Sequence, residues 1–292
     1  MNRLTVIGFG LIGGSFALAH KRLRQTHVTA IDFPNVLEQP SASEAADELI
    51  DARALDQVEL ALASSTLVLL STPVRVICEN LPRVLATAPL ATDAGSTKRE
   101  VQRAARGCPR GARFVPAHPM AGLPDGGIEQ ARADLFDGRP WFVCPEGADS
   151  DAVNHVETWI QEAGAVAVRM TAAAHDAAVA RTSHLPRLVA SAVLGVVEAA
   201  GASAAAGPAL QRLARTVGGP ESIWRDIFES NADEIGEALL ELTAILVPIA
   251  EELRSGGKTE RAEALLQAAR RVRADLGQAD SPGKPSRREG RK

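Results

Sequence analysis

The chain has 292 residues, enough for two domains or one large one, and 46% of them are apolar, so a full hydrophobic core can be buried. Its mild net charge of −4 argues neither for a nucleic-acid partner nor for a membrane surface, and neither is expected. No segment approaches the ~20 continuous apolar residues of a membrane span, and no signal peptide is evident, so a cytoplasmic location is expected. Cys78, Cys108 and Cys144 have neither metal-ligand spacing nor a disulfide pattern, so we expect free thiols and no metal.

Short apolar runs alternate with amphipathic stretches in the first part of the chain. The pattern predicts a first helix over residues 11–22 and strands over residues 4–7, 28–31, 66–70, 91–93, 113–116, 141–144 and 165–170. Strands that alternate with helices imply parallel βαβ units. The sequence therefore predicts an α/β protein whose residues 1–171 form an N-terminal Rossmann domain with a doubly wound parallel sheet.

The character of the sequence changes after Thr171. Residues 172–277 are rich in Ala and Leu, have helical periodicity and lack a convincing strand, which predicts an all-α domain. Residues 235–253 carry apolar side chains on nearly every face, which is typical of a helix buried between neighbours or across a subunit interface. Residues 278–292 are rich in Pro, Gly, Ser, Arg and Lys and are predicted to be a disordered, solvated basic tail.

The segment from Gly8 to Gly13 fits the G-x-G-x-x-G pattern between the first strand and the first helix, where a dinucleotide binds. The first glycine permits a tight turn, the second lets the backbone approach a pyrophosphate, and the third allows close packing of helix on sheet. The start of the helix offers free N–H groups to phosphates. The predicted cofactor-binding residues are Gly8, Gly10, Leu11, Ile12, Gly13, Asp32, Ser71, Thr72 and Pro73.

Asp32 ends the second strand, 19 residues beyond Gly13. A carboxylate at this place can bond the ribose hydroxyls and repels the 2′-phosphate of NADP. The residues that follow, Phe33, Pro34 and Asn35, offer no cation for that phosphate. We therefore expect NAD rather than NADP as the cofactor.

Several polar motifs follow predicted strands or open helices: Ser71-Thr72-Pro73-Val74, Asp93-Ala94-Gly95-Ser96-Thr97-Lys98, Ala117-His118-Pro119-Met120-Ala121-Gly122, His175-Asp176, Ser183-His184-Leu185-Pro186 and Trp224-Arg225-Asp226-Ile227-Phe228. Their order and spacing, together with the glycine motif, resemble the prephenate/arogenate (cyclohexadienyl) dehydrogenase family over nearly the whole chain. The resemblance implies a Rossmann domain followed by a helical dimerisation domain in a homodimer. It also implies NAD(P)-dependent oxidative decarboxylation of prephenate or arogenate to an aromatic product, in tyrosine or related aromatic biosynthesis.

The resemblance also implies roles for individual residues. His118 matches the catalytic histidine, and a neutral imidazole is a suitable base near neutral pH. Ser96 matches the serine that bonds the same substrate hydroxyl. Arg215 matches a substrate-binding arginine, whose fork suits a carboxylate, while Ser183 and His184 are expected near the substrate. The pair His175-Asp176 fits a helix cap as well as a site element.

Two departures from the family pattern fall where recognition of the substrate side chain is expected. Arg187 stands where many members have a histidine, so we expect it to meet the substrate or to close the pocket mouth. Residues 123–127 read Leu-Pro-Asp-Gly-Gly where the family often has Thr-Glu-Lys-Ser-Gly. Prephenate, arogenate and a ring-amino analogue of prephenate therefore all stay open as substrates.

Two other functions compete with this interpretation. A β-hydroxyacid dehydrogenase generally uses a lysine in its helical domain, but no lysine occurs between Thr171 and Gly256. A non-catalytic NAD-binding sensor could lose the polar site residues, yet Ser96, His118 and Arg215 are all present.

Overall fold

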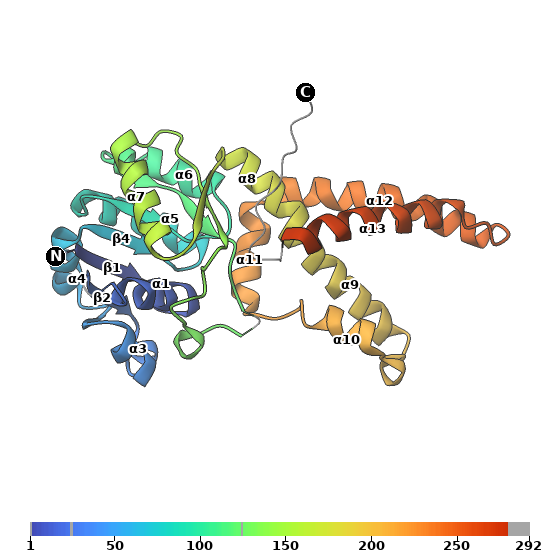
Figure 1. The fold of residues 1–292 in the computed structure, drawn as a ribbon, viewed down its shortest axis with the longest axis horizontal. Helices are drawn as coiled ribbons and strands as arrows, with labels where there is room; N and C mark the ends of the chain where they lie inside the picture. The colour runs from blue at the N-terminus through green and yellow to red at the C-terminus, as the bar shows by residue number, and fades with distance from the viewer. Residues whose placement is uncertain (1, 24–25, 124, 280–292) are drawn as a thin grey trace, which may run out of the picture. The chain divides into compact units, whose positions relative to one another are not determined.

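The computed structural model describes residues 2–23, 26–123 and 125–279 (Figure 1). They form two compact units, of which the first ends at Ile235 and the second begins at Gly236. The first unit holds all the strands and every side chain discussed below as part of a site.

Six parallel strands make the main sheet, in the order β3-β2-β1-β4-β5-β6. Their bounds are β1 (Asn2–Ile7), β2 (Thr26–Asp32), β3 (Glu48–Asp51), β4 (Leu67–Leu70), β5 (Ala91–Asp93) and β6 (Phe114–Val115). This is the strand order of a Rossmann fold, in which ligands bind where the order reverses, between β1 and β4. The predicted fold class is confirmed. The edge strand β3 was not predicted, because only Ile50 in it is buried and it lacks an apolar run.

Helices cover both faces of this sheet. One face packs on α1 (Leu11–Lys21), α3 (Pro40–Ala45) and α7 (Ser150–Glu162), and the other on α4 (Leu55–Ser64), α5 (Val74–Thr87) and α6 (Arg99–Arg106). The short α2 (Pro34–Leu37) follows β2. Strand β4 is continuously apolar because both of its faces are buried. Leu67 and Leu69 enter the core on the first face of the sheet, and Val68 and Leu70 enter the core on the second.

A second sheet has three strands, β7 (Ala117–Pro119), β8 (Pro140–Val143) and β9 (Val166–Arg169). Strand β7 is antiparallel to β8, which is parallel to β9. The sequence analysis had placed residues 141–144 and 165–170 in one series with the Rossmann strands, so the structure corrects their position. The predicted strand over residues 113–116 ends at Val115, because Pro116 has no N–H to continue the ladder, and β7 starts directly after it.

From Ala172 onward, every regular element in the described residues is helical. They are α8 (Ala172–Val179), a single π-helical turn (Ala180–His184), α9 (Leu185–Ala199), α10 (Pro208–Ala214), α11 (Glu221–Ser230), α12 (Ala232–Arg254) and α13 (Glu260–Ala279), with one short 3₁₀ turn (Ser203–Ala205). The first compact unit includes α8 to α11. Arg99 of α6 holds this helical part, because its guanidinium bonds Asp176, Asn231 and Asp233.

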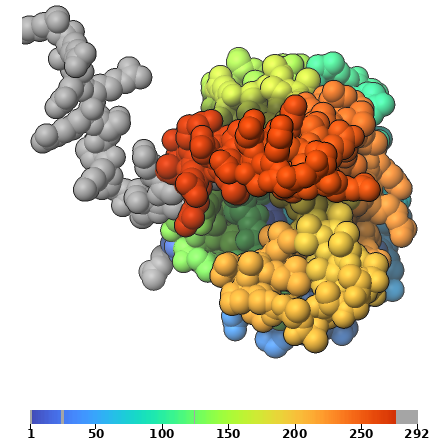
Figure 2. Space-filling view, turned by 90° about the vertical axis from the view of Figure 1, so that its right-hand side faces the viewer, coloured from blue at the N-terminus to red at the C-terminus, as the bar shows by residue number. Residues whose placement is uncertain are grey.

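The second unit consists of α12 from Gly236 onward and the whole of α13. An ion pair of 3.2 Å between Arg261 and Glu252 links the two helices. Apolar side chains of these helices are exposed in the single chain, among them Leu239, Leu240, Ile245, Leu246, Val247, Leu253, Leu265, Leu266 and Val272. Figure 2 shows one side of α12 and α13 in orange and red. Helix α13 runs to Ala279, and residues 280–292, the rest of the predicted tail, lie outside the described residues.

In the described residues, no helix has both the length and the apolar character to cross a membrane. The same residues contain no cluster of His, Cys, Asp and Glu that could hold a metal ion. All three cysteines are free thiols.

Candidate active site

The glycine-rich turn between β1 and α1 has room for a ligand at one point only. Gly8 has φ +91°, and a Cβ there would lie 2.6 Å from the carbonyl oxygen of Ser71. A Cβ on Gly13 would collide with the carbonyl oxygen of Gly8. At Gly10, by contrast, a Cβ would meet nothing within 4 Å. The first and third glycines are therefore required by packing, whereas the second borders open space.

The start of α1 faces this space with free backbone donors. The N–H groups of Leu11 and Ile12 lack intrahelical partners because they lie in the first turn, and no side chain caps the helix at Gly10 in their place. Asp32 accepts hydrogen bonds from Phe9 N at 2.6 Å and from Phe33 N at 2.7 Å, one on each carboxylate oxygen. Each oxygen keeps a further lone pair for a ribose hydroxyl. Open space, free N–H groups and a placed carboxylate together fit a dinucleotide.

A cavity of about 580 Å³ joins the nucleotide turn to the helical part of the first unit. It brings together ten of the residues predicted for the site: Gly10, Leu11, Ile12, Ser71, Ser96, His118, Ser183, His184, Arg187 and Arg215. A smaller cavity of about 160 Å³ is lined by Thr72 and Pro73 and also by Ser71 and Ser96. Gly8, Gly13 and Asp32 line neither cavity. The two glycines shape the turn, and Asp32 bonds the backbone N–H of Phe9 within it.

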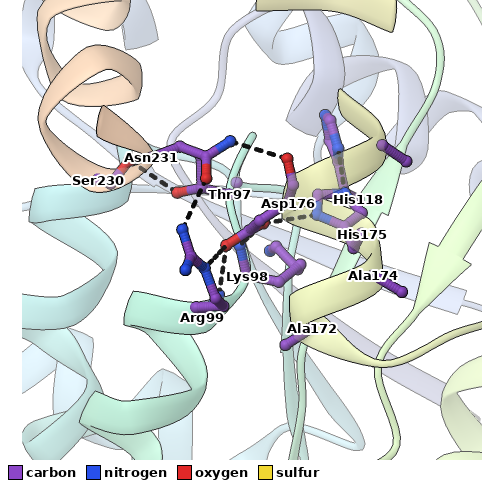
Figure 3. Close-up of polar contacts among 12 residues, drawn as sticks. Thr97, Lys98, Arg99, His118, Ala172, Ala174, His175, Asp176, Ser230 and Asn231 are labelled. Carbon is purple, nitrogen blue, oxygen red and sulfur yellow. Dashed lines mark hydrogen bonds and ion pairs between the residues drawn. The ribbon is translucent and has the colours of Figure 1, made fainter. Parts of the chain in front are cut away.

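His118 lies on β7, opposite Phe142 of β8, and its half-buried ring borders the large cavity. Its Nδ1 is 2.9 Å from Nε2 of His175, so Nε2 is the ring nitrogen that stays available to a ligand (Figure 3). Burial, together with the nearby His175, Lys98 and His184, lowers the pKa of His118 well below its ordinary value of 6.5. The imidazole is therefore neutral, as a base must be.

The pair His175-Asp176 of α8 is fully buried next to His118. His175 Nδ1 is 2.8 Å from Asp176 Oδ1, and the carboxylate also accepts the N–H groups of Lys98 at 2.7 Å and Arg99 at 2.9 Å. The carboxylate thus caps the start of α6, a different helix from its own. Sequence analysis left open whether this pair belonged to the site. The adjacent His and Asp soon after the last strand, β9, are the sequence signal that could have assigned this pair to the site.

A buried ion pair fixes the strand that carries His118. Lys98 Nζ bonds the carboxylate of Asp93 and donates to the carbonyl oxygen of Ala117 at 2.8 Å, while Ala117 N donates to Asp93 at 3.0 Å. Both charged side chains are fully buried. Sequence analysis assigned a role in this segment to Ser96 alone and missed the support that Lys98 and Asp93 give to His118.

Part of the cavity wall comes from the π-helical turn, a local conformation that is frequent at functional sites. It carries Ser183 and His184, both of which line the cavity. His184 is buried, its Nδ1 lies 3.4 Å from Asn231 Nδ2, and its ring meets Trp224 edge-on. Burial lowers the pKa of His184 to about 4, so this histidine is neutral as well.

The two arginines of the cavity differ in how they are engaged. Arg187 donates from Nη1 to the carbonyl oxygens of Thr216, at 3.0 Å, and Gly218, and its guanidinium carbon lies 4.6 Å from the centre of the Trp224 ring. Arg187 therefore holds the loop that follows Arg215. Arg215 is exposed and has no ion-pair partner in the described part of the chain, which leaves its guanidinium available for an anion.

Comparison with known proteins places this site in a family. The family descriptions "Prephenate dehydrogenase, nucleotide-binding domain" and "Prephenate dehydrogenase, dimerization domain" match residues 17–169 and 171–268. The "Prephenate dehydrogenase" of Bacillus subtilis is 30% identical over 247 residues, 80% of this chain and 65% of that protein. The "Probable prephenate dehydrogenase NovF" of Streptomyces niveus is 34% identical over 163 residues, 54% of this chain and 44% of that protein. The chain thus spans less than two thirds of these two relatives.

A solved structure has the same fold. The prephenate dehydrogenase of Aquifex aeolicus, crystallised with hydroxyphenyl propionate and NAD+, matches with a TM-score of 0.79 at 24% identity, covering 96% of this chain and 99% of that one. Together, the two family descriptions match most of the chain, from residue 17 to residue 268. The chain therefore belongs to the prephenate dehydrogenase family.

Proposed function

We propose that this protein is an NAD-dependent dehydrogenase that oxidatively decarboxylates a cyclohexadienyl substrate, prephenate or arogenate, to an aromatic product. One observation carries the proposal: a single cavity joins the dinucleotide turn, Ser96, the neutral His118 and the unpaired Arg215. We assign dinucleotide binding to residues 1–171, and substrate binding and dimerisation to residues 172–277.

The side chains divide the chemistry between them. When bound, NAD supplies the hydride acceptor. Nε2 of His118 accepts the proton of the ring hydroxyl, Ser96 bonds the same oxygen, and Arg215 holds a carboxylate of the substrate. Loss of carbon dioxide from the opposite ring carbon leaves an aromatic ring, which makes the step irreversible.

We favour NAD over NADP because of the end of β2. The carboxylate of Asp32 would repel a 2′-phosphate. The next three residues, Phe33, Pro34 and Asn35, carry no positive charge.

The deciding experiment is an assay of NAD reduction with prephenate, arogenate and a ring-amino analogue of prephenate side by side, with carbon dioxide release measured in parallel. At least one substrate should give equal amounts of NADH and carbon dioxide. His118→Asn should lose this activity, whereas His155→Asn, at an exposed position on α7, should keep it. Absence of turnover with all three substrates would refute the proposal.

The assembly is proposed to be a homodimer formed through α12 and α13. The exposed apolar side chains of these helices support it, as does the description "dimerization domain" for residues 171–268. Light scattering should give twice the chain mass of 30.7 kDa. Leu240→Glu should weaken the dimer, and Leu60→Glu, at a leucine of α4 that is at least as exposed, should not. A fully active wild-type monomer would contradict this assembly.

The proposed location is the cytoplasm. Three free thiols fit a reducing compartment, and an enzyme that uses NAD as a co-substrate needs a compartment that regenerates it. Fractionation of cells that produce the protein should recover NADH-forming activity with the cytoplasmic markers. Recovery with an extracytoplasmic marker would contradict the location.

A further inference from the structure

A chain of three side chains runs from the cavity into the protein: the half-buried His118 and the fully buried His175 and Asp176 (Figure 3). The ring of His175 lies between the other two, 2.9 Å from His118 Nδ1 and 2.8 Å from Asp176 Oδ1. We propose that His175 and Asp176 are positioning residues that fix the tautomer of His118, so that its Nε2 is the nitrogen that accepts the substrate proton. This inference rests on the proposed function.

The tautomers follow from the inner end of the chain. Burial alone would raise the pKa of Asp176, but hydrogen bonds from His175 and from the N–H groups of Arg99 and Lys98 outweigh it and lower that pKa. An ionised carboxylate can only accept hydrogen bonds, so Nδ1 of His175 carries a proton. Burial lowers the pKa of His175 despite the carboxylate, and the neutral ring then has a lone pair on Nε2.

The same reasoning extends one ring further. Because Nε2 of His175 can only accept, Nδ1 of His118 must donate to it. The single proton of the neutral His118 ring is thereby placed on Nδ1, and its lone pair on Nε2 borders the cavity. When Nε2 takes the proton of the substrate hydroxyl, the resulting imidazolium keeps its Nδ1–H bond to His175. The negative charge of Asp176, one ring away, stabilises it.

The surroundings prevent the middle ring from turning. Phe142 meets the ring of His175 edge-on, with 5.6 Å between ring centres, and Phe142 itself lies opposite His118 in the β7–β8 pair. Asp176 is held by the backbone N–H groups of Lys98 and Arg99. These two residues follow Ser96 closely, so one carboxylate positions the base and the segment that carries the serine.

The test compares two replacements of His175. The Gln side chain in His175→Gln has an oxygen that can accept from His118 Nδ1–H, whereas His175→Leu offers no acceptor. His155→Leu, an exposed histidine of α7, is the matched control. Ring-nitrogen NMR reports which nitrogen of His118 carries the proton, and steady-state kinetics report kcat and KM. Binding of NAD, measured by calorimetry, reports that each variant is folded.

In the wild type we expect the His118 proton on Nδ1. His175→Leu should move a large fraction of it to Nε2 and lower kcat about 10- to 100-fold, with little change in the affinity for NAD. His175→Gln should restore the Nδ1 proton and most of kcat, which a merely structural role of His175 would not predict. An unchanged tautomer in His175→Leu, or kcat within about twofold of the wild type, overturns the inference. If the wild type turns over no cyclohexadienyl substrate, the proposed function fails, and the NMR result alone decides the tautomer.

Discussion

His20 of α1 is a buried histidine away from the cavity, and its replacement should change how stability depends on pH. Its side chain is completely buried, with ring centres 4.5 Å from Phe16 and 4.6 Å from Trp159. Neither ring nitrogen has a partner of ordinary hydrogen-bond distance and angle in the described residues, and a carboxylate oxygen of Glu162 lies 3.9 Å from Nδ1. A backbone contact with Trp159 raises the pKa of the ring, but by less than burial lowers it. Burial lowers the pKa of His20 from 6.5 to about 4.

The sign of the effect follows from where the proton binds more tightly. The unfolded chain binds a proton at His20 near pH 6.5, whereas the folded protein does so only near pH 4. Above pH 6.5 His20 is neutral in both the folded and the unfolded state, so its protonation does not change the free energy of unfolding. As the pH falls below 6.5 the unfolded state is favoured, by about 2 kcal/mol at about pH 5 and by roughly 3 kcal/mol below about pH 4. His20→Leu removes this titration.

Urea unfolding at about pH 7.5 and about pH 5 measures how the free energy of unfolding depends on pH. Tryptophan fluorescence follows the unfolding, since Trp159 lies beside His20. Between the two pH values the wild type should lose about 2 kcal/mol more of its free energy of unfolding than His20→Leu does. The control His155→Leu, at an exposed histidine, should lose as much as the wild type. Equal losses in the wild type and His20→Leu would refute the reasoning, because His20 would then not be buried in its neutral form.

The other predictions concern the cavity. His118→Asn should lower kcat about 10²–10⁴-fold at unchanged KM for NAD. Because the pKa of His118 is lowered, wild-type kcat should fall only below pH 6.5, and an acid limb centred above it would contradict the neutral base. Asp32→Ser should narrow the ratio of kcat/KM between NAD and NADP, and a wild-type preference for NADP would refute the role of Asp32. Arg215→Ala should raise the substrate KM about 30-fold or more, and an unchanged KM would exclude carboxylate binding there. Arg187→His should change the ratio of kcat/KM between prephenate and arogenate, because Arg187 holds the loop after Arg215; an unchanged ratio would show that it does not set specificity.

Some features could be predicted because their signals are local in the sequence. The glycine pattern from Gly8 to Gly13 follows a short apolar strand, and the buried strand β4 is a continuous apolar run, so both could be recognised within a few residues. The strand β3 and the three-residue β7 could not, because their residues have no clear apolar period and depend on neighbouring strands for their hydrogen bonds. The same limit put residues 141–144 and 165–170 in the wrong sheet.

Side-chain partners distant in sequence were decided by tertiary structure alone. His118 and His175 are 57 residues apart, and nothing in either segment indicates that their ring nitrogens meet. Arg187 was expected to meet the substrate or to close the pocket mouth. It lines the cavity, and its guanidinium also bonds carbonyl oxygens 29 and 31 residues further on and lies over the Trp224 ring. The sequence by itself determined the Rossmann class, the nucleotide turn and the residue types of the site, since these depend on local periodicity and on glycine geometry. Only the folded chain decided which histidine lies beside His118 and which arginine of the cavity has no ion-pair partner in the described residues, because those contacts depend on how packed helices and strands bring distant segments together.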